Sequence, residues 1–564
     1  GRIGFDENGL RGEGVTGDYL GRPVSGFIET VEDANGHTRA RLNGHADAAY
    51  IARHLHNAGL LASDGIGEMP ILARIQGEAP WQATIDVLEQ HASGEAPVVL
   101  RVESNLESAA LALPAPFAKP VGEPLPIVVE AHFADRVHRE MRLTMGGLAS
   151  GVFDLRDGDG GYRMHRANVH LGGGTATLPK DARLTITGRV AHTDLGDWSN
   201  LALSPQEGTS QADALPTRVD VAVERLAVLG AEFDAVHITA SSTDEGGWRA
   251  SIVGDQLDGQ ITVPTRSGDA PVTARFDRLT VSPLPEGDAN PPDPRGLPPV
   301  HFSCRQCTFG DTSLSDIELV TSKIPEGMRI DSLRLRSHAF DASAGATWTV
   351  GEDDAQRTRL DARLASPDLG NLLTALGHKG DATRGGVTDL TLTAAWDGSP
   401  SDFDLERLDG VLHFRTGEGT LTDIERGTAG RLFGLLVVPD LPRRLKGDFS
   451  DLFEKGFVYR EIEGTFNIER GNAYTNNLTL DGSLARINIA GRTGLVAEDY
   501  DQLITVTPKL SESLPLMPIW LVEKAFQKEL FNKLFAYQYT VTGSWNAPSV
   551  TRVRIQHDPS SGRS

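Results

Sequence analysis

Apolar and polar residues alternate with a period of two along most of this chain. The clearest run spans residues 218–224, and shorter runs recur towards the C-terminus. Their apolar members are Val219, Val221, Val223, Leu333, Leu335, Leu390, Leu392, Leu478, Leu480, Ile487 and Ile489. Successive side chains of a β-strand point to opposite faces, so each run predicts a strand with one apolar and one polar face. We therefore expect a sheet that water wets on one side only.

Short turn signals separate these runs. They lie at Asp33–Gly36, Asp157–Gly160, Asp244–Gly247 and Asp481–Gly482, and such combinations of Asp, Asn and Gly favour tight hairpins. Long helical patterns do not alternate with the strands, which disfavours a parallel sheet with crossover helices. The sequence therefore predicts a mostly β fold built from antiparallel meanders.

One short pattern occurs three times: a strand, then an acidic residue, then a short helix. The acidic residues are Asp47, Asp194 and Asp368. Their spacing is unequal, which indicates a degenerate repeat rather than a strict solenoid period. Each repeat would leave a sheet edge that the next one continues.

Two proline-rich stretches punctuate the chain, Leu113–Pro126 with five prolines and Pro283–Pro299 with seven. Proline cannot donate to a β-ladder, so both stretches predict crossovers, or long loops within one continuous sheet. We expect β-groove sections at 1–112, 127–282 and 300–425, separated by the stretches 113–126 and 283–299, and a C-terminal region at 426–564.

Composition argues against several classes of protein. The formal net charge of -23 repels phosphate backbones, and no basic stripe offsets it, so no nucleic-acid partner is expected. Apolar runs stay far below the roughly 20 residues that a membrane span needs, and no charged-then-apolar leader opens the chain. Because residue 1 is Gly, we expect the N-terminal part of a larger protein, with any membrane anchor, to be missing.

No cluster of residues predicts catalysis or a cofactor. Cys304 and Cys307 have the spacing of a redox or zinc half-site, but the surrounding residues indicate a strand and a turn. A local disulfide or two buried thiols is expected there instead. Asp154, Asp157 and Asp159 lack the spacing and the closing glutamate of a calcium loop, so a hairpin turn is expected. We expect no enzyme activity, no cofactor and no metal.

The segment 518–536 predicts an amphipathic C-terminal helix. Its apolar stripe is formed by Ile519, Val522, Phe526, Leu530 and Leu534. Such a helix either caps the end of the sheet or lies on a membrane surface. In the second case the residues in contact with the membrane would be Trp520, Lys524, Phe526, Lys528, Leu530 and Phe531.

The C-terminal third carries several unusual peptides in a specific order. They are 431–436, 441–445, 448–453, 455–457, 506–508 and 539–545, with further matches upstream at 104–106, 113–120 and 396–400. This pattern resembles the YhdP family, large AsmA-like proteins of Gram-negative envelopes. The residues that carry the motif are Arg431, Leu432, Pro442, Arg443, Arg444, Asp448, Phe449, Asp451 and Gly456. Where the family often has a glycine-rich stretch before its last helix, this chain has Leu516–Trp520.

The resemblance implies an elongated U-shaped β-groove with an apolar floor. It also implies a protein anchored in the inner membrane whose body crosses the periplasm and moves phospholipid towards the outer membrane, which supports the permeability barrier there. This chain would be the C-terminal half, and the anchor would lie in the missing N-terminal part. Partners would be phospholipid acyl chains, the inner and outer membranes, and outer-membrane or periplasmic proteins.

A one-sided sheet of this length must cover its apolar face or leave a trough for apolar guests. Residues that could line such a trough, or form an ordinary core, are the eleven alternating residues above together with Phe233, Val236 and Ile238. Three other functions compete with a lipid groove. They are a TamB-like scaffold or chaperone for outer-membrane proteins, a surface adhesin, and a glycan-active β enzyme, which should show paired carboxylates in an aromatic cleft.

Overall fold

The computed structural model describes most of the chain in two compact units, residues 1–268 and 269–564. Each unit is treated by itself below. The described residues are 2–6, 9–19, 21–31, 37–57, 74–88, 98–133, 138–158, 161–202, 215–228, 230–265, 270–281, 292–310, 312–376, 383–421, 457–483, 485–509 and 536–553.

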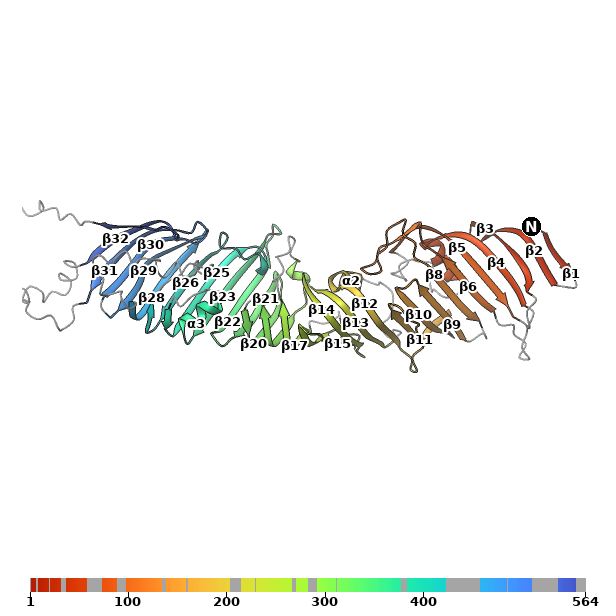
Figure 1. The fold of residues 1–564 in the computed structure, drawn as a ribbon, viewed down its shortest axis with the longest axis horizontal. Coiled ribbons are helices and arrows are strands. Elements are labelled where there is room, and N and C mark those ends of the chain that lie inside the picture. Colours follow the sequence, from red (N-terminus) through yellow and green to blue (C-terminus); the bar gives the residue numbers. More distant parts are fainter. Residues whose placement is uncertain are drawn as a thin grey trace, which may run out of the picture. The chain divides into compact units, whose positions relative to one another are not determined.

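The first unit is a single layer of strands that follow one another across the sheet (Figure 1). Its strands are β1 (Arg2–Asp6), β2 (Gly9–Tyr19), β3 (Arg22–Val31), β4 (His37–Asp47), β5 (Ile75–Val87), β6 (Val98–Ser104), β7 (Ala109–Leu111), β8 (Ile127–Phe133), β9 (His138–Met145), β10 (Ala149–Gly158), β11 (Gly161–Leu171), β12 (Leu184–Asp194), β13 (Thr217–Val228), β14 (Ala231–Ser242), β15 (Trp248–Val253) and β16 (Leu257–Val263). Neighbours pair antiparallel, except that β12 lies parallel to both β11 and β13. The short β7 pairs with the start of β5.

The second unit repeats this architecture. Its strands are β17 (Val272–Val281), β18 (Val300–Phe309), β19 (Thr312–Leu314), β20 (Asp316–Ile324), β21 (Gly327–Arg336), β22 (Asp341–Val350), β23 (Gln356–Ser366), β24 (Thr383–Gly385), β25 (Thr388–Asp397), β26 (Asp409–Thr416), β27 (Gly419–Leu421), β28 (Phe457–Glu469), β29 (Asn472–Gly482), β30 (Ala485–Gly494), β31 (Asp499–Pro508), β32 (Tyr537–Ser544) and β33 (Ser549–Val553). Two 3₁₀ turns lie at Pro294–Gly296 and Pro400–Asp402. The ladders are antiparallel, apart from the parallel pair β17–β18.

The predicted mostly β fold, an open sheet with a few short helices, is confirmed. In neither unit does a ladder between described residues join the first strand to the last. The three parallel junctions were not predicted. Two parallel neighbours run in the same direction, so the chain must return to the edge of the sheet where the first strand began before the second can start. A two-residue hairpin is too short for this return. The return connections are 172–183, 195–216 and 282–299.

Three short helices follow strands as the repeated pattern predicts: α1 (Ala48–Asn57), α2 (Leu195–Ala202) and α3 (Leu369–Ala375). The carboxylate of Asp47 accepts a hydrogen bond from the backbone N–H three residues later, at 2.8 Å. Asp368 does the same at 2.9 Å, and Asp194 accepts from the N–H two residues later at 2.7 Å. Each acidic residue thus satisfies an orphan donor in the first helical turn, which explains why a helix begins there.

Candidate functional site: the apolar face of the sheet

In the first unit the strand register lines up apolar residues into rows that cross the sheet. Directly paired residues share a face, so the ladders alone define these rows. The central row is Leu42, Ala83, Val102, Val129, Leu143, Gly151, Val169, Ile186, Val219, Ala240, Ala250 and Ile261. The flanking row is Ile127, Met145, Ala149, Leu171, Gly188, Val221, Ile238, Ile252 and Gly259. Both rows continue through the parallel junctions.

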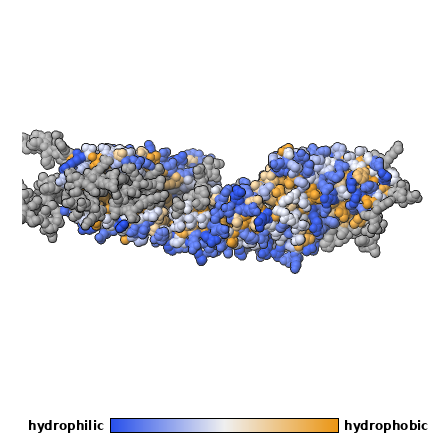
Figure 2. Space-filling view, in the orientation of Figure 1, coloured by the Kyte–Doolittle hydropathy of each residue, from blue (hydrophilic) through white to orange (hydrophobic). Residues whose placement is uncertain are grey.

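The large residues of the central row remain accessible. Leu42, Val102, Val129, Leu143, Val169, Ile186 and Val219 are all half-buried rather than buried. Figure 2 shows apolar patches between polar ones on the surface of this unit. A half-exposed apolar row of this length is typical of a surface that binds apolar molecules.

A hollow of about 830 Å³ crosses β2–β6 and β8 near the start of the sheet. Apolar-face residues Val24, Trp81 and Ile127 line it together with their polar neighbours. The indole of Trp81 lies over Gly44, where a Cβ would come within 2.6 Å of the Trp81 ring. Glycine at position 44 therefore lets the large ring lie flat against its strand partner.

The proline-rich segment 113–126, here called the strap, covers part of the flanking row. Its Phe117 and Leu125 are buried and pack in one cluster with Met145 of β9. Ile127, Ala149 and Leu171 of the same row pack against that cluster. The strap thus shields the flanking row beside β8–β11, while the central row next to it stays accessible.

Contacts with the end of β12 and with α2 hold the strap in place. The ring of Phe117 meets the ring of Trp198 edge to face, with centroids 5.9 Å apart. The Thr193 hydroxyl donates to the carbonyl oxygen of Ala115 at 3.1 Å and accepts from Trp198 Nε1 at 2.7 Å. Lys119 is buried, and its Nζ donates to two carbonyl oxygens within the strap at 2.9 and 2.7 Å. Its charge is therefore satisfied locally.

Apolar rows also cross the second unit. One row is Phe302, Leu319, Leu333, Ala344, Ala362, Leu392, Leu412 and Phe466. Its neighbour is Cys304, Ile317, Leu335, Ala342, Leu364, Leu390, Phe414 and Gly464. Towards the C-terminus, beyond an interruption of the β28–β29 ladder, two further rows are Leu478–Ile489–Ile504–Tyr539 and Leu480–Ile487–Val506–Tyr537.

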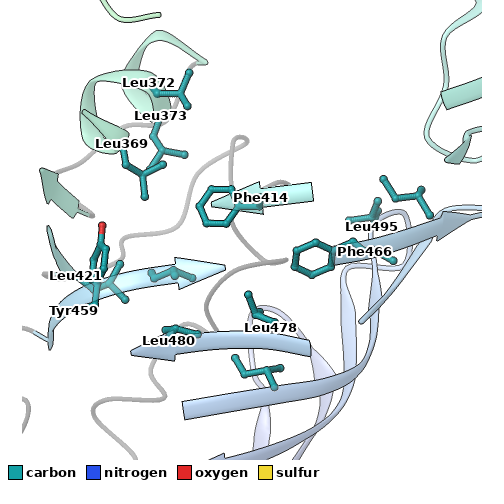
Figure 3. Packing of buried hydrophobic residues seen from close by; sticks show 14 of the residues in the cluster. Leu369, Leu372, Leu373, Phe414, Leu421, Tyr459, Phe466, Leu478, Leu480 and Leu495 are labelled. Atoms are coloured by element: carbon teal, nitrogen blue, oxygen red, sulfur yellow. The ribbon is translucent and has the colours of Figure 1, made fainter. Parts of the chain in front are cut away.

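Burial differs along these rows, and Cys304 and Ile317 at the start of the second row are buried. Leu333, Leu335, Leu390 and Leu392 are half-buried, whereas Leu478 and Phe466 have no exposed surface. Figure 3 shows Phe414, Phe466, Leu478 and Leu480 gathered in one interior, near the leucines of α3. The far end of this unit is therefore a closed apolar core.

The predicted trough residues fall into two groups in the structure. Val221, Val223, Phe233, Val236, Leu478, Leu480, Ile487 and Ile489 are buried. Val219, Ile238, Leu333, Leu335, Leu390 and Leu392 are half-buried. The register brings many of them together as direct pairs: Val221–Ile238, Val223–Val236, Leu478–Ile489 and Leu480–Ile487. Phe233 pairs with Leu226 beyond an interruption of the ladder at Ala235, whose φ is +52°.

Other predicted sites lie outside the described residues. These are the motif residues Arg431, Leu432, Pro442, Arg443, Arg444, Asp448, Phe449, Asp451 and Gly456, and the predicted membrane-contact residues Trp520, Lys524, Phe526, Lys528, Leu530 and Phe531. The helix predicted at 518–536 falls there as well, apart from its last residue.

Cys304 and Cys307 form a disulfide within β18, which is one of the two arrangements expected there. Both are buried and belong to the apolar cluster of the second unit. In the part of the chain that the structure describes, no group of His, Cys, Asp and Glu side chains could hold a metal ion. Asp154 instead pairs with Arg166 at 2.8 Å.

On the polar face near the C-terminal strands, ion pairs hold the acidic residues Asp481 and Asp499. Two hydrogen bonds of 2.8 Å from the Arg492 guanidinium hold the pKa of Asp499 below its usual value. Lys509, helped by Arg486, lowers the pKa of Asp481. Burial raises the pKa of Tyr459 and of Tyr500, so both phenols stay neutral at physiological pH.

Sequence reasoning missed several residues of the apolar face, among them Leu143, Val169 and Ala250. Leu143 lies in the alternating run Met141, Leu143 and Met145, so its strand does carry the signal, but that run is not among those named above. The importance of the missed residues comes from pairing with apolar residues far away in the sequence, which only the register reveals. The strap was predicted as a linker or loop, and nothing in its composition shows which row it covers.

Comparison with known proteins identifies relatives of the chain. It is 22% identical over 583 residues to a protein of Escherichia coli (strain K12) named "Intermembrane phospholipid transporter YhdP". That alignment includes 99% of this chain but 44% of the relative, so the chain spans less than half of the relative's length. No solved structure matches the chain. None of the described helices is long and apolar enough to cross a membrane. The family model described as YhdP protein matches residues 1–550, and the chain therefore belongs to the YhdP family.

Proposed function

We propose that this chain is a non-enzymatic section of a lipid carrier, on which phospholipid acyl chains lie along the apolar rows of the sheet. The protein would work in the periplasm of a Gram-negative envelope and would be anchored in the inner membrane. It would carry phospholipid passively towards the outer membrane and so support the permeability barrier. The name of the Escherichia coli relative supports this assignment.

The observation that carries the proposal is the continuity of the half-buried central row from β4 to β16. Each buried methylene contributes about 0.8 kcal/mol, so an acyl chain gains from any stretch of the row. Because successive strands present similar residues, a lipid that moves by one strand exchanges one apolar contact for another. Such a surface binds acyl chains without a single specific site. Movement of a lipid along the surface requires this lack of a specific site.

Leu143 and Thr144 provide a matched test of this proposal. They are neighbours in β9, with Leu143 in the central row and Thr144 exposed on the opposite face. Purification without detergent from an envelope-containing host should yield bound phospholipid for the wild type and for Thr144→Asp. Leu143→Asp should retain less than about half as much lipid per protein, because its carboxylate would lose water against an acyl chain. Mass spectrometry measures the lipid.

Two results would count against the carrier. Equal lipid in Leu143→Asp and Thr144→Asp would show that the central row does not hold acyl chains. A stable wild-type protein that carries bound polypeptide and no lipid would favour the alternative function, a TamB-like scaffold or chaperone for outer-membrane proteins. Circular dichroism of both variants shows whether each retains its sheet.

A further inference from the structure

Three arginines line a hollow of about 480 Å³ in the first unit. Arg183 directly precedes β12, Arg218 is the second residue of β13, and Arg249 is the second residue of β15. Ser241 of β14 pairs with both Arg218 and Arg249 across the ladders, so these side chains lie on the same face in adjacent strands. The three guanidinium groups therefore gather near one set of strand ends.

Among the residues that the structure describes, carboxylates neutralise this cluster only in part. The described residues that line the hollow include no Asp or Glu, and neither Arg218 nor Arg249 forms an ion pair with another described residue. Arg183 contacts Asp181 at 3.0 Å, yet its Nε is buried without a hydrogen-bond partner. Asp220, the next acidic residue on this face of β13, pairs with His237 at 3.1 Å.

The hollow also offers neutral hydrogen-bond donors. The hydroxyls of Thr239, Ser241 and Ser251 line it beside the arginines. Guanidinium groups gathered in one place repel one another, and an anion bound between them would relieve that repulsion. Guanidinium forks and hydroxyls are the donors that proteins use for phosphate oxygens. The chemistry therefore favours an anion with several oxygens as the ligand.

Apolar residues reach the same strand ends on the other face of the sheet. Ser242 pairs with Trp248, and Trp248 with Val263. Trp248 and Val263 are 38% and 41% exposed, next to the central-row pair Ala240–Ala250. Exposed tryptophans and basic residues are typical of protein surfaces that contact lipid headgroups, as at a membrane–water interface.

We propose that the hollow formed by Arg183, Arg218 and Arg249 binds the phosphate of a phospholipid whose acyl chains lie on the central row. The headgroup turns round the ends of β13–β15 and receives hydrogen bonds from the arginines and the serine hydroxyls. This site rests on the proposed carrier function and adds to it a place where the charged end of the lipid is recognised. It selects phospholipids over neutral lipids with the same chains.

Isothermal titration calorimetry on the full chain tests this site with three probes: dihexanoylphosphatidylglycerol, dihexanoylglycerol and inorganic phosphate. The variant is Arg218→Ser with Arg249→Ser. The control is Arg359→Ser with Arg363→Ser, two exposed arginines of β23 in the second unit. We expect the variant to weaken binding of the phospholipid about tenfold or more. The affinity of this variant for dihexanoylglycerol should stay within about twofold of the wild type. The control should bind the phospholipid and dihexanoylglycerol with affinities that also stay within about twofold of the wild type.

The outcomes separate the site from the carrier function. Wild-type affinity of the Arg218/Arg249 variant for the phospholipid would overturn the headgroup site while leaving the acyl-binding face intact. Inorganic phosphate that binds the wild type as tightly as the phospholipid does, and is lost in the variant, would make this a site for free phosphate instead. Failure of dihexanoylglycerol to bind the wild type would contradict the carrier function itself.

Discussion

Replacing Phe466 by alanine is expected to lower the free energy of unfolding of the second unit by about 3–5 kcal/mol. Phe466 has no exposed surface and packs among the fully buried residues of this unit (Figure 3). Its side chain in β28 belongs to the row that begins at Phe302 and pairs with Leu412. Removal of the ring leaves a cavity in a region where several strands meet, and collapse around it would disturb their register.

Hydrogen exchange of the β26–β31 amides in increasing urea measures this loss locally. Tyr474→Ala is the control, because Tyr474 lies in the neighbouring strand β29 and is 42% exposed. Its effect should stay below about 0.5 kcal/mol. If Phe466→Ala lowers the free energy of unfolding as little as Tyr474→Ala does, this would contradict the closed core at this end of the unit.

Gly188→Ala is expected to destabilise the parallel junction of β11 and β12 by about 2–6 kcal/mol, the sum of backbone strain and steric overlap. Gly188 has a φ of +116°, which L side chains rarely adopt, and a Cβ there would overlap the carbonyl oxygen of Leu171. The residue also belongs to the flanking row, between Leu171 and Val221. A side chain at this position would push the two strands apart.

Amide exchange across β11–β13 reports the effect on the junction. Gly173→Ala is the matched control, because a Cβ at Gly173 would meet nothing within 4 Å. That variant should behave like the wild type to within about 0.5 kcal/mol. If the β11–β13 amides of the two alanine variants exchange at the same rates, the close approach of Gly188 to the Leu171 carbonyl oxygen does not stabilise the junction.

The strands and their apolar face were predictable because alternation is a local property. Val219, Val221 and Val223 show their common face within five residues of sequence, and pairs such as Leu390 and Leu392 show it within three. The acidic residue before each helix was predictable for the same reason, since the cap and the helix that it starts are adjacent. The disulfide between Cys304 and Cys307 also follows from neighbours in the chain.

Pairing between distant strands was not predictable. Val219 and Ile186 share the central row although 33 residues separate them (219 − 186), and neither residue carries a signal for the other. The parallel junctions depend on connections such as 172–183, whose composition does not say to which end of the sheet the chain returns. The arginine hollow has the same origin, because Arg183, Arg218 and Arg249 meet only through the register.

Site-specific photo-crosslinking tests the central claim, that acyl chains lie on the central row. Ile186 and Thr187 are neighbours in β12 on opposite faces: Ile186 is in the central row, and Thr187 bonds to His170 at 3.0 Å on the polar face. Benzoylphenylalanine in place of Ile186 should yield a phospholipid adduct on irradiation in an envelope-containing host, and in place of Thr187 it should yield none or far less. Equal adducts at both positions, or adducts at Thr187 alone, would contradict the account.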